Sequence, residues 1–285
     1  MDYKTIKLDQ LFNLDYFKKF IGNEKWEFKI DCPMCSLPYH YGILGEYDNI
    51  NKYEGKIQGG RSQNGEDGLL KYIFEILNVE HKYCIEFGAG NGEWLSNTYY
   101  FRKILNWDCL LLEGNNKEVL KGNSNGENTL YNEYITKDNI NELFEKYKVP
   151  KNIDLLSIDL DSIDYFVFEK LDVNKYSPNV IIIETNSGLP NNIPLIIDHS
   201  NNSNTNIWYF GCNLLAIYDL AKKKGYEFLT TVRWNAIFIK KEHFSKFNIP
   251  LISREECINK YFKPNNYSVS LISKYLKQHH EYLTY

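Results

Sequence analysis

The segment that most constrains the fold of this chain runs from Lys82 to Gly92 and reads K-Y-C-I-E-F-G-A-G-N-G. Its first half is a short apolar and aromatic run that one acid, Glu86, interrupts, and its second half places glycine at every second position, Gly88, Gly90 and Gly92. A short apolar run that stops abruptly at glycines predicts a buried strand followed by a tight loop. Glycine in such a loop lets a ligand approach the backbone closely.

A second apolar run, from Trp107 to Leu112, ends at an acid, Glu113. An acid at the end of the next strand suits the two hydroxyls of a ribose, which predicts a nucleotide-type cofactor at the carboxyl ends of parallel strands. A dinucleotide fingerprint would need a third glycine where Glu93 stands, and a P-loop is excluded because no Lys-Ser/Thr pair follows the glycines. The alternative is that the glycine-rich loop is only a turn, and the acid at position 113 weakens that alternative.

The length of 285 residues suits one α/β domain with additions at its ends. We expect an N-terminal cap segment over residues 1–57, a main domain over 58–245 and a C-terminal helical extension over 246–285. A hydrophobic content of 43% supplies enough apolar side chains for a core.

Charge and hydropathy exclude several classes of protein. The net charge of -4 and the lack of a basic stripe argue against nucleic acid as the main partner. The first ten residues lack the apolar core of a secretory signal, and no run approaches the ~20 apolar residues of a membrane span. We therefore expect a cytoplasmic protein whose six cysteines are mostly reduced. Whether it forms a homo-oligomer stays open.

One cysteine pair, in Cys32-Pro-Met-Cys35, resembles half of a zinc site, with His40 as a third candidate ligand. Structural zinc needs four ligands, and no second C-x-x-C follows. The spacing therefore favours a turn with two incidental thiols over a zinc site.

Polar residues precede the glycine loop in the segment Arg61–Gly68, after which apolar residues follow at helical spacing. The pattern predicts a helix start, and three of its side chains, Gln63, Glu66 and Asp67, are candidates for lining the cofactor site. Helix capping alone is the alternative. After the loop, Glu93–Leu105 is expected to be a helix whose first turn offers N–H groups to a carboxylate.

Acids and an amide follow two further apolar runs. Ile153–Ile158 ends in an acidic stretch, and Val180–Ile183 ends in an acid and an amide. Carboxylate and amide oxygens at the ends of neighbouring strands match the ligands of Mg²⁺ or Mn²⁺. The alternative is that the acids only begin the helix Tyr165–Leu171. The acidic stretch contains Asp159, Asp161 and Asp164, and the second run delivers Glu184 and Asn186.

A long polar loop over residues 187–207 holds Asp198 and His199. Long loops inside a compact domain are usually functional, so His199 is a candidate general base, with a solvated histidine as the alternative. Beyond it the sequence predicts a helix that ends at Lys224, two strands, Tyr226–Val232 and Ala236–Ile239, and a terminal helix over 267–285.

Several ordered blocks resemble the FkbM-like class I S-adenosylmethionine-dependent methyltransferases over roughly residues 60–240. The blocks are S-Q-N-G-E-D-G at Ser62–Gly68, I-E-F-G-A-G-N-G at Ile85–Gly92 and D-L-L-S-I-D-L-D at Asp154–Asp161. Later blocks are I-E-T-N-S, F-G-C-N-L, K-G-Y and N-A-I-F. One departure is Ile163, where this branch usually has asparagine, and it bears on the acceptor rather than on the cofactor.

The resemblance implies a Rossmann-like seven-stranded methyltransferase sheet, mostly parallel with an antiparallel last strand. It implies O-methylation of a carbohydrate hydroxyl, on a sugar, a sugar nucleotide or the sugar of a glycan or natural product, and S-adenosyl-L-methionine as cofactor. By the same resemblance the methionine end is held by Glu86, Gly88, Gly90 and Gly92, and the ribose by Glu113. Asp159 lies beside the sulfonium, and Asp161, Glu184 and Asn186 face the acceptor and a metal. Two alternatives stay open: a non-catalytic module that binds the cofactor, and a dinucleotide-dependent oxidoreductase on the same sheet.

Overall fold

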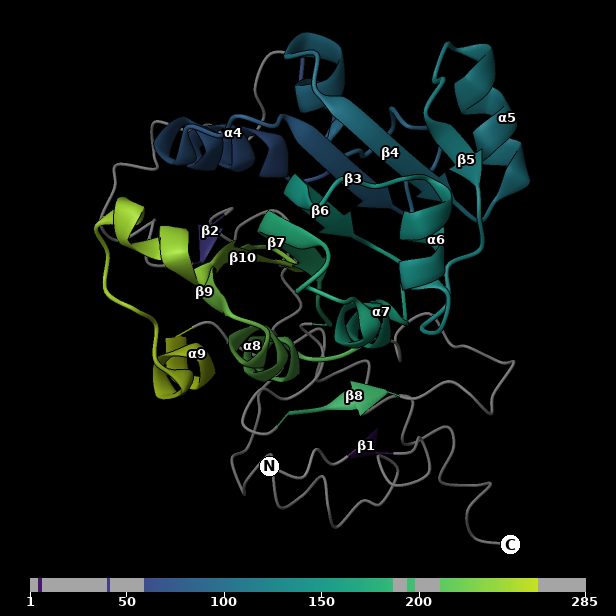
Figure 1. The fold of residues 1–285 in the computed structure, drawn as a ribbon. Coiled ribbons are helices and arrows are strands. Elements are labelled where there is room, and N and C mark those ends of the chain that lie inside the picture. The colour runs from purple at the N-terminus through teal and green to yellow at the C-terminus, as the bar shows by residue number, and fades with distance from the viewer. Residues whose placement is uncertain (1–4, 7–39, 42–58, 187–193, 198–210, 261–285) are drawn as a thin grey trace, which may run out of the picture.

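The computed structural model describes residues 5–6, 40–41, 59–186, 194–197 and 211–260. Its centre is an eight-stranded sheet with the order β2-β9-β10-β7-β6-β3-β4-β5 (Figure 1). The strands are β2 (His40–Tyr41), β3 (Tyr83–Phe87), β4 (Asp108–Glu113), β5 (Leu130–Asn132), β6 (Asn152–Ile158), β7 (Ser177–Glu184), β9 (Tyr226–Val232) and β10 (Asn235–Lys240).

The pairing of the strands gives the sheet its class. Neighbours from β5 through β4, β3 and β6 to β7 pair in parallel, and β10 is antiparallel to both β7 and β9. The predicted fold, a Rossmann-like α/β sheet of seven mostly parallel strands with an antiparallel last strand, is confirmed. The two-residue strand β2 extends it beyond β9 by antiparallel pairing and was not expected.

Helices cover both faces of this sheet (Figure 1). One face carries α6, α7 and α8, and the other carries α4, η3 and η4. The helical segments are α4 (Glu66–Leu77), the π-helix η3 (Tyr100–Ile104), α5 (Asn116–Ser124), α6 (Ile140–Lys146), α7 (Asp164–Lys170), α8 (Leu214–Lys223), the 3-10 helix η4 (Lys241–Phe247) and α9 (Arg254–Lys260). None of the helices within the described ranges has the length and apolar character needed to cross a bilayer.

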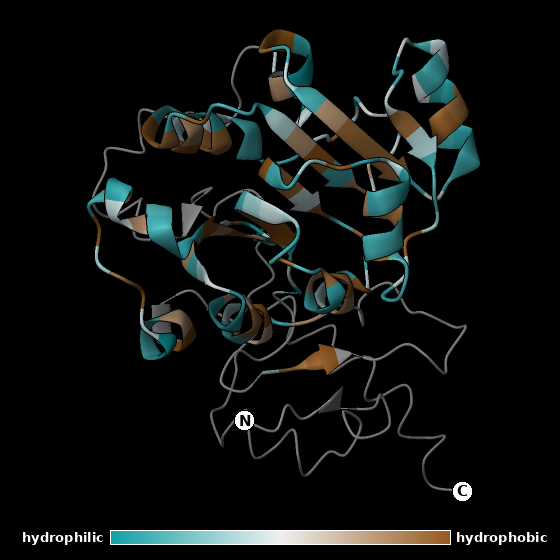
Figure 2. Ribbon diagram, in the orientation of Figure 1, coloured by the Kyte–Doolittle hydropathy of each residue, from teal (hydrophilic) through white to brown (hydrophobic). Residues whose placement is uncertain are grey.

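The central strands are apolar on both sides because helices cover both faces. In β3, Ile85 and Phe87 pack into the cluster formed with α6, α7 and α8, whereas Cys84 packs into the cluster formed with α4 and η3. Figure 2 shows the matching hydrophobic colour along the central strands. Each buried side chain of this size contributes roughly 1.5–3 kcal/mol, so the strands that end at the site form a rigid base.

Two further features lie outside the central sheet. A second, two-stranded parallel sheet pairs β1 (Thr5–Ile6) with β8 (Ile196–Ile197). The helix α9 is attached to α8 by a bidentate ion pair in which Arg254 donates to both carboxylate oxygens of Asp219 at 2.9 Å. The expected terminal helix over 267–285 and the cysteines Cys32 and Cys35 lie outside the described residues.

The helix expected over Glu93–Leu105 is wrong for its first half, because regular helix begins only with η3. The Oδ1 of Asn91 accepts hydrogen bonds from the N–H groups of Glu93 and Trp94 at 3.0 and 2.9 Å. These two N–H groups are therefore not exposed as they would be in the first turn of a helix. Leu95 then has φ +61, a left-handed value incompatible with a continuing α-helix.

Candidate active site

A cavity of about 1000 Å³ opens at the carboxyl ends of the parallel strands. The glycine loop after β3, the ends of β4, β6 and β7, and the turn between β9 and β10 all line it. This is the edge at which ligands bind in open α/β sheets. Residues of the sequence-derived candidate set that line the cavity are Gln63, Glu86, Gly88, Gly90, Glu113, Asp159, Asp161 and Glu184.

Gly88 brings the end of β3 against the end of β6. Its φ is +67, and a Cβ added to it would lie 1.8 Å from the backbone oxygen of Asp159. No other residue fits there, because both the conformation and the space require glycine. The contact fixes the backbone of Asp159 relative to the glycine loop, and these are the two segments that sequence analysis assigned to the cofactor.

Glu113 connects the glycine loop to the end of β4. Its Oε2 accepts a hydrogen bond from the N–H of Gly90 at 2.8 Å, and its Oε1 accepts one from the N–H of Asn115 at 2.6 Å. Each carboxylate oxygen has a second lone pair, so both can still accept from a ligand hydroxyl. The predicted ribose acid is therefore held in a fixed orientation on the cavity wall.

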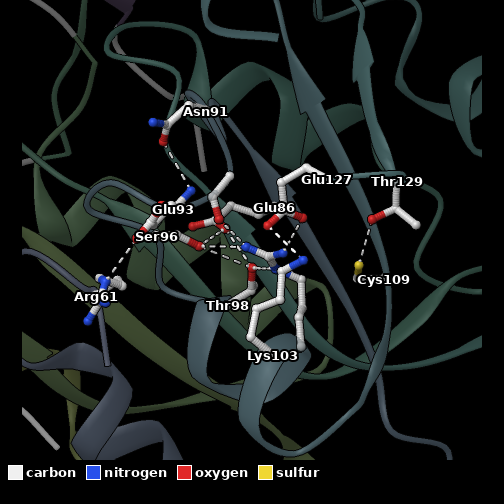
Figure 3. A network of polar contacts seen from close by, with 12 residues as sticks. Arg61, Glu86, Asn91, Glu93, Ser96, Thr98, Lys103, Cys109, Glu127 and Thr129 are labelled. Atoms are coloured by element: carbon white, nitrogen blue, oxygen red, sulfur yellow. Dashed lines mark hydrogen bonds and ion pairs between the residues drawn. The ribbon is translucent and has the colours of Figure 1, made fainter. Parts of the chain in front are cut away.

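Glu86 lies deeper, and its carboxylate holds the loop that follows the glycines (Figure 3). Its Oε2 accepts from the hydroxyls of Ser96 and Thr98, both at 2.6 Å, and its Oε1 accepts from the N–H of Asn97 at 2.7 Å. With 4% of its surface exposed, Glu86 therefore acts on a ligand mainly through this loop. Sequence analysis missed Ser96 and Asn97, although both line the cavity.

A buried ion pair lies beside this loop. Arg102, in η3, donates to Glu127 at 2.8 Å and to the hydroxyl of Thr98 at 3.0 Å, and it also donates to the backbone oxygen of Gly92. Lys103 pairs with the other oxygen of Glu127 at 3.0 Å (Figure 3). Gly92 itself does not line the cavity, so among the three loop glycines it serves packing, against Glu127.

Of the three polar candidates around the start of α4, only Gln63 lines the cavity. Glu66 and Asp67 are fully buried. The carboxylate of Glu66 accepts from Asn64 and from the side-chain amide of Asn235, and that of Asp67 accepts from the N–H of Ser62 at 3.1 Å. These two acids therefore hold the segment before α4 and the start of β10, and so fix the wall on which Gln63 stands.

Three carboxylates, from Asp159, Asp161 and Glu184, form a cluster in the cavity with one oxygen of each within 4.8 Å of the others. The Oε2 of Glu184 is buried and has no hydrogen-bond partner. Burial and the neighbouring carboxylates raise the pKa of both Asp159 and Glu184 well above the usual range. Such a cluster is stable only with bound protons or a bound cation.

The predicted metal ligands are only partly brought together. Asp161 and Glu184 belong to the carboxylate cluster, whereas Asp159 rather than Asn186 completes it, and Asn186 does not line the cavity. Asp164 is buried and accepts from the N–H of Leu160 at 2.8 Å, so it holds the loop that precedes α7. Burial raises its pKa to about 7. Asp198 and the candidate base His199 lie outside the described residues.

Large aromatic side chains on the cavity rim were not predicted as site residues. Trp94 is 73% exposed and Tyr134 is 78% exposed, and both line the cavity together with Trp234. Nothing in the periodicity of the sequence separates these from core aromatics: Trp94 falls in the helix expected over Glu93–Leu105, and Tyr134 and Trp234 fall between predicted elements. Ile163, at the departure from the family pattern, also lines the cavity.

The residues present fit the two groups that the sequence implies. The unpartnered oxygen of Glu184, together with two further carboxylates, provides the hard oxygen ligands that a divalent cation prefers. Room for a nucleoside is available between the glycine loop and the end of β4. Gly90 has open space where a Cβ would stand, and Glu113 keeps acceptors beside it.

Comparison with solved structures gives methyltransferases at low similarity. Neither a family model nor a curated protein sequence matches the chain. An O-methyltransferase from Bacillus cereus in complex with SAH is 17% identical in sequence and has a TM-score of 0.39. The match covers 69% of this chain and 88% of the Bacillus cereus chain. The N-terminal domain of EvdMO1, solved in the presence of SAH and D-fucose, is 10% identical and has a TM-score of 0.40. The match covers 67% of this chain and 93% of that domain. A putative sarcosine dimethylglycine methyltransferase from Galdieria sulphuraria is 13% identical and has a TM-score of 0.37. The match covers 65% of this chain and 73% of the Galdieria sulphuraria chain.

Proposed function

We propose that this protein is an S-adenosylmethionine-dependent O-methyltransferase that methylates a hydroxyl of a carbohydrate, with a divalent cation at the carboxylate cluster. The observation that carries the proposal is the position of two groups in one cavity. The Gly90–Glu113 hydrogen bond lies on one wall, and the cluster of Asp159, Asp161 and Glu184 lies at the neighbouring strand ends.

The donor would bind between the glycine loop and β4. Glu113 would accept from the ribose hydroxyls with its remaining lone pairs, and Gly88 and Gly90 would leave room for the methionine end. The carboxylate of Asp159 would lie beside the sulfonium, whose positive charge it stabilises. This division of roles matches the order of the strands, because β3, β4 and β6 are neighbours in the sheet.

The acceptor hydroxyl would bind at the carboxylate cluster. Methyl transfer from a sulfonium needs in-line approach of the hydroxyl oxygen, so most of the acceleration comes from orientation. A divalent cation bound there would lower the pKa of the hydroxyl. Asp159, a member of the cluster, is a candidate proton acceptor, and His199 stays a second candidate for general base.

Isothermal titration with S-adenosylhomocysteine tests the donor site directly. We expect a Kd in the micromolar range, roughly -8 kcal/mol, and a Kd at least tenfold weaker for Glu113→Gln. Glutamine keeps the size of the side chain but cannot accept at both of the N–H groups that Glu113 now binds. The matched control is Glu142→Gln, at an exposed position of α6 outside the cavity.

Incubation with S-adenosylmethionine and a panel of sugars then separates an enzyme from a non-catalytic module. Release of S-adenosylhomocysteine that depends on the sugar and is lost on chelation of divalent cations would support the full proposal. Binding without any release would support the non-catalytic module instead. Absence of binding heat in wild type would remove the methyltransferase proposal, and absorbance of a copurified flavin or nicotinamide would point to the oxidoreductase.

A further inference from the structure

Several segments that line the cavity are joined to one another by backbone and side-chain contacts. Ser62 forms a β-bridge with Leu95, which joins the segment of Gln63 to that of Trp94. The amide of Asn235 donates to Glu66 at 3.0 Å, and the N–H of Thr185 donates to the backbone oxygen of Trp234 at 2.7 Å. We call this surface the acceptor wall, and its members are Gln63, Trp94, Asp161, Glu184, Trp234 and Asn235.

The charges that line the cavity are almost all negative. Among the described residues, seven carboxylates and a single lysine line it. That lysine, Lys121, stands on α5 at the donor side, 3.9 Å from Glu118. Neither Arg61 nor Arg233 is among the lining residues, and Arg61 is paired with Glu93 at 3.4 Å. Residues 187–210, which follow β7 in the chain, contain no lysine or arginine.

Phosphate recognition requires positive charge, and no cationic side chain is among the described residues of this wall. Phosphates are bound by arginine, by lysine, by N–H groups at a helix N-terminus or by a divalent cation. Of these, the described lining of the cavity offers one lysine on the donor side and the carboxylates that would hold a cation. A like-charged group placed against two or more carboxylates costs several kcal/mol. One divalent cation and the donor sulfonium would add three positive charges to a cavity with seven carboxylates and one lysine, so its sign would remain negative.

The side chains of the acceptor wall are suited to binding an uncharged, polyhydroxylated ring. Indole rings such as those of Trp94 and Trp234 provide large apolar faces for the C–H surface of a sugar, and an indole that is 73% exposed, as in Trp94, is available to a ligand. Amides and carboxylates bind hydroxyl groups as acceptors, and amides also donate. We infer that the acceptor is an unphosphorylated carbohydrate and that the enzyme discriminates against phosphorylated and nucleotide-linked sugars. This inference rests on the proposed function and narrows its substrate class.

Matched acceptors test the inference. Neutral hexoses, deoxyhexoses and their methyl glycosides are each compared with the corresponding sugar 1-phosphate and uridine-diphosphate-linked sugar. The full chain is used, with S-adenosylmethionine and Mg²⁺, and S-adenosylhomocysteine release is followed. We expect turnover of at least one neutral sugar, with kcat/KM at least tenfold higher than for its phosphorylated forms.

The outcomes separate this inference from the proposed function. Equal or faster turnover of a phosphorylated form would overturn the inference and leave the methyltransferase intact. Binding of S-adenosylhomocysteine with no turnover of any sugar would also overturn it, because it names carbohydrates as the acceptor class. Absence of S-adenosylhomocysteine binding would instead be a failure of the proposed function itself.

A charge substitution on the acceptor wall tests the cause of the discrimination. Gln63 is exposed on the cavity wall, so Gln63→Lys adds a cation there without disturbing the core, and Gln63→Met is the uncharged control of similar size. We expect Gln63→Lys to narrow the ratio of kcat/KM between a neutral sugar and its 1-phosphate at least threefold relative to Gln63→Met. Equal ratios for the two variants would show that charge on this wall does not set the preference.

Discussion

At the scale of single residues, Gly88 carries the strongest steric constraint on the site. A side chain there would meet two separate costs, the left-handed φ of +67 and the backbone oxygen of Asp159 at 1.8 Å. The first cost alone is about 1–2 kcal/mol for a residue other than glycine. The second cannot be relieved by a rotamer change, because the obstacle is backbone on the neighbouring strand.

We therefore predict that Gly88→Ala lowers the free energy of unfolding by more than about 2 kcal/mol and weakens S-adenosylhomocysteine binding at least tenfold. The control is Gly126→Ala, where φ is +90 but no atom lies within 4 Å of the added Cβ, so only the conformational cost applies. Urea unfolding and isothermal titration measure the two quantities. A Gly88→Ala variant as stable as Gly126→Ala would contradict the close contact.

Glu184 shows the opposite case, a residue whose presence costs stability. Its pKa is raised from 4.5 to about 9, first by burial and then by Asp159, so the folded state keeps a proton that the unfolded state has lost. Stability therefore falls as pH rises from the unfolded pKa toward the folded one. Glutamine has no such proton to lose.

In protein freed of divalent cations with a chelator, we predict that Glu184→Gln has a higher Tm than wild type and that this difference grows between pH 6 and pH 9. Thermal unfolding followed by circular dichroism measures it, with Glu142→Gln as the exposed control. A difference in Tm that stays constant over this range would show that Glu184 is not held in its protonated form.

At the scale of elements, a buried ion pair ties the π-helix η3 to Glu127, in the segment between α5 and β5, and Arg102 also donates to the backbone oxygen of Gly92 in the glycine loop. The side chains of Arg102 and Glu127 are 2% and 6% exposed, and Lys103 adds a second, 36% exposed partner. Removing one member of a buried pair leaves the other charge without compensation, at a cost of about 3–5 kcal/mol. Removing both costs less, because no uncompensated charge remains.

We predict that Arg102→Leu destabilises the protein by about 3 kcal/mol and that the double variant Arg102→Leu/Glu127→Leu is more stable than this single variant. Lys103→Leu is the control and should cost no more than about 1 kcal/mol, because the lysine is partly exposed. Denaturant unfolding of both single variants, Arg102→Leu and Glu127→Leu, and of the double variant gives the coupling energy. If the losses in unfolding free energy of the two single variants add up to the loss in the double variant, the pair is not energetically coupled.

The same elements show how far the sequence could predict the fold. The apolar runs gave β3, β9 and the cores of β4, β6, β7 and β10, because strands buried on both faces are continuously hydrophobic. The strand β5 and the helix α5 were missed: β5 has three residues, two of them exposed, and α5 buries only Val119 and Gly122. Elements that bury so little leave no periodic pattern to recognise.

Residues of the candidate site that stand at the ends of strands could be predicted from the sequence, and residues that stand in loops could not. Gly88, Gly90, Glu113, Asp159, Asp161 and Glu184 all follow directly from the ends of predicted strands, and all line one cavity. Glu66 and Asp67 were placed there because polar residues at the start of a helix look alike whether they face a ligand or bond to neighbouring backbone. Trp94, Tyr134 and Trp234 were missed because their exposure depends on loop conformation.

At the scale of the whole molecule, negative charge is concentrated at one edge of the sheet. The ends of β3, β4, β6 and β7, which are far apart in the sequence, deliver carboxylates to one cavity, while the chain as a whole carries a net charge of only -4. A cleft lined by one sign of charge and bounded by apolar walls concentrates its field. Such a cavity favours a cation over an uncharged molecule of the same shape.

The methyl donor and its product provide such a pair, since S-adenosylmethionine carries a sulfonium and S-adenosylhomocysteine a neutral sulfur. A positive charge ~6 Å from one net negative charge gains roughly 3 kcal/mol at an effective dielectric constant of ~20, before screening by salt. We predict that in a chelator the donor binds at least about threefold more tightly than the product. Mg²⁺ held by the carboxylate cluster offsets part of the field, so the ratio of the two Kd values should fall toward one when it is added.

Isothermal titration of both ligands, with and without Mg²⁺ at constant ionic strength, measures this ratio. In Glu184→Gln the cluster loses one ligand for the cation, so the ratio should change less with Mg²⁺ than in wild type, whereas Glu142→Gln should behave as wild type. A ratio that is the same with and without Mg²⁺ in wild type would mean that the cation and the sulfonium do not share this field. The donor would then be bound away from Asp159, and the assignment of the cavity into donor and acceptor sides would have to be reversed.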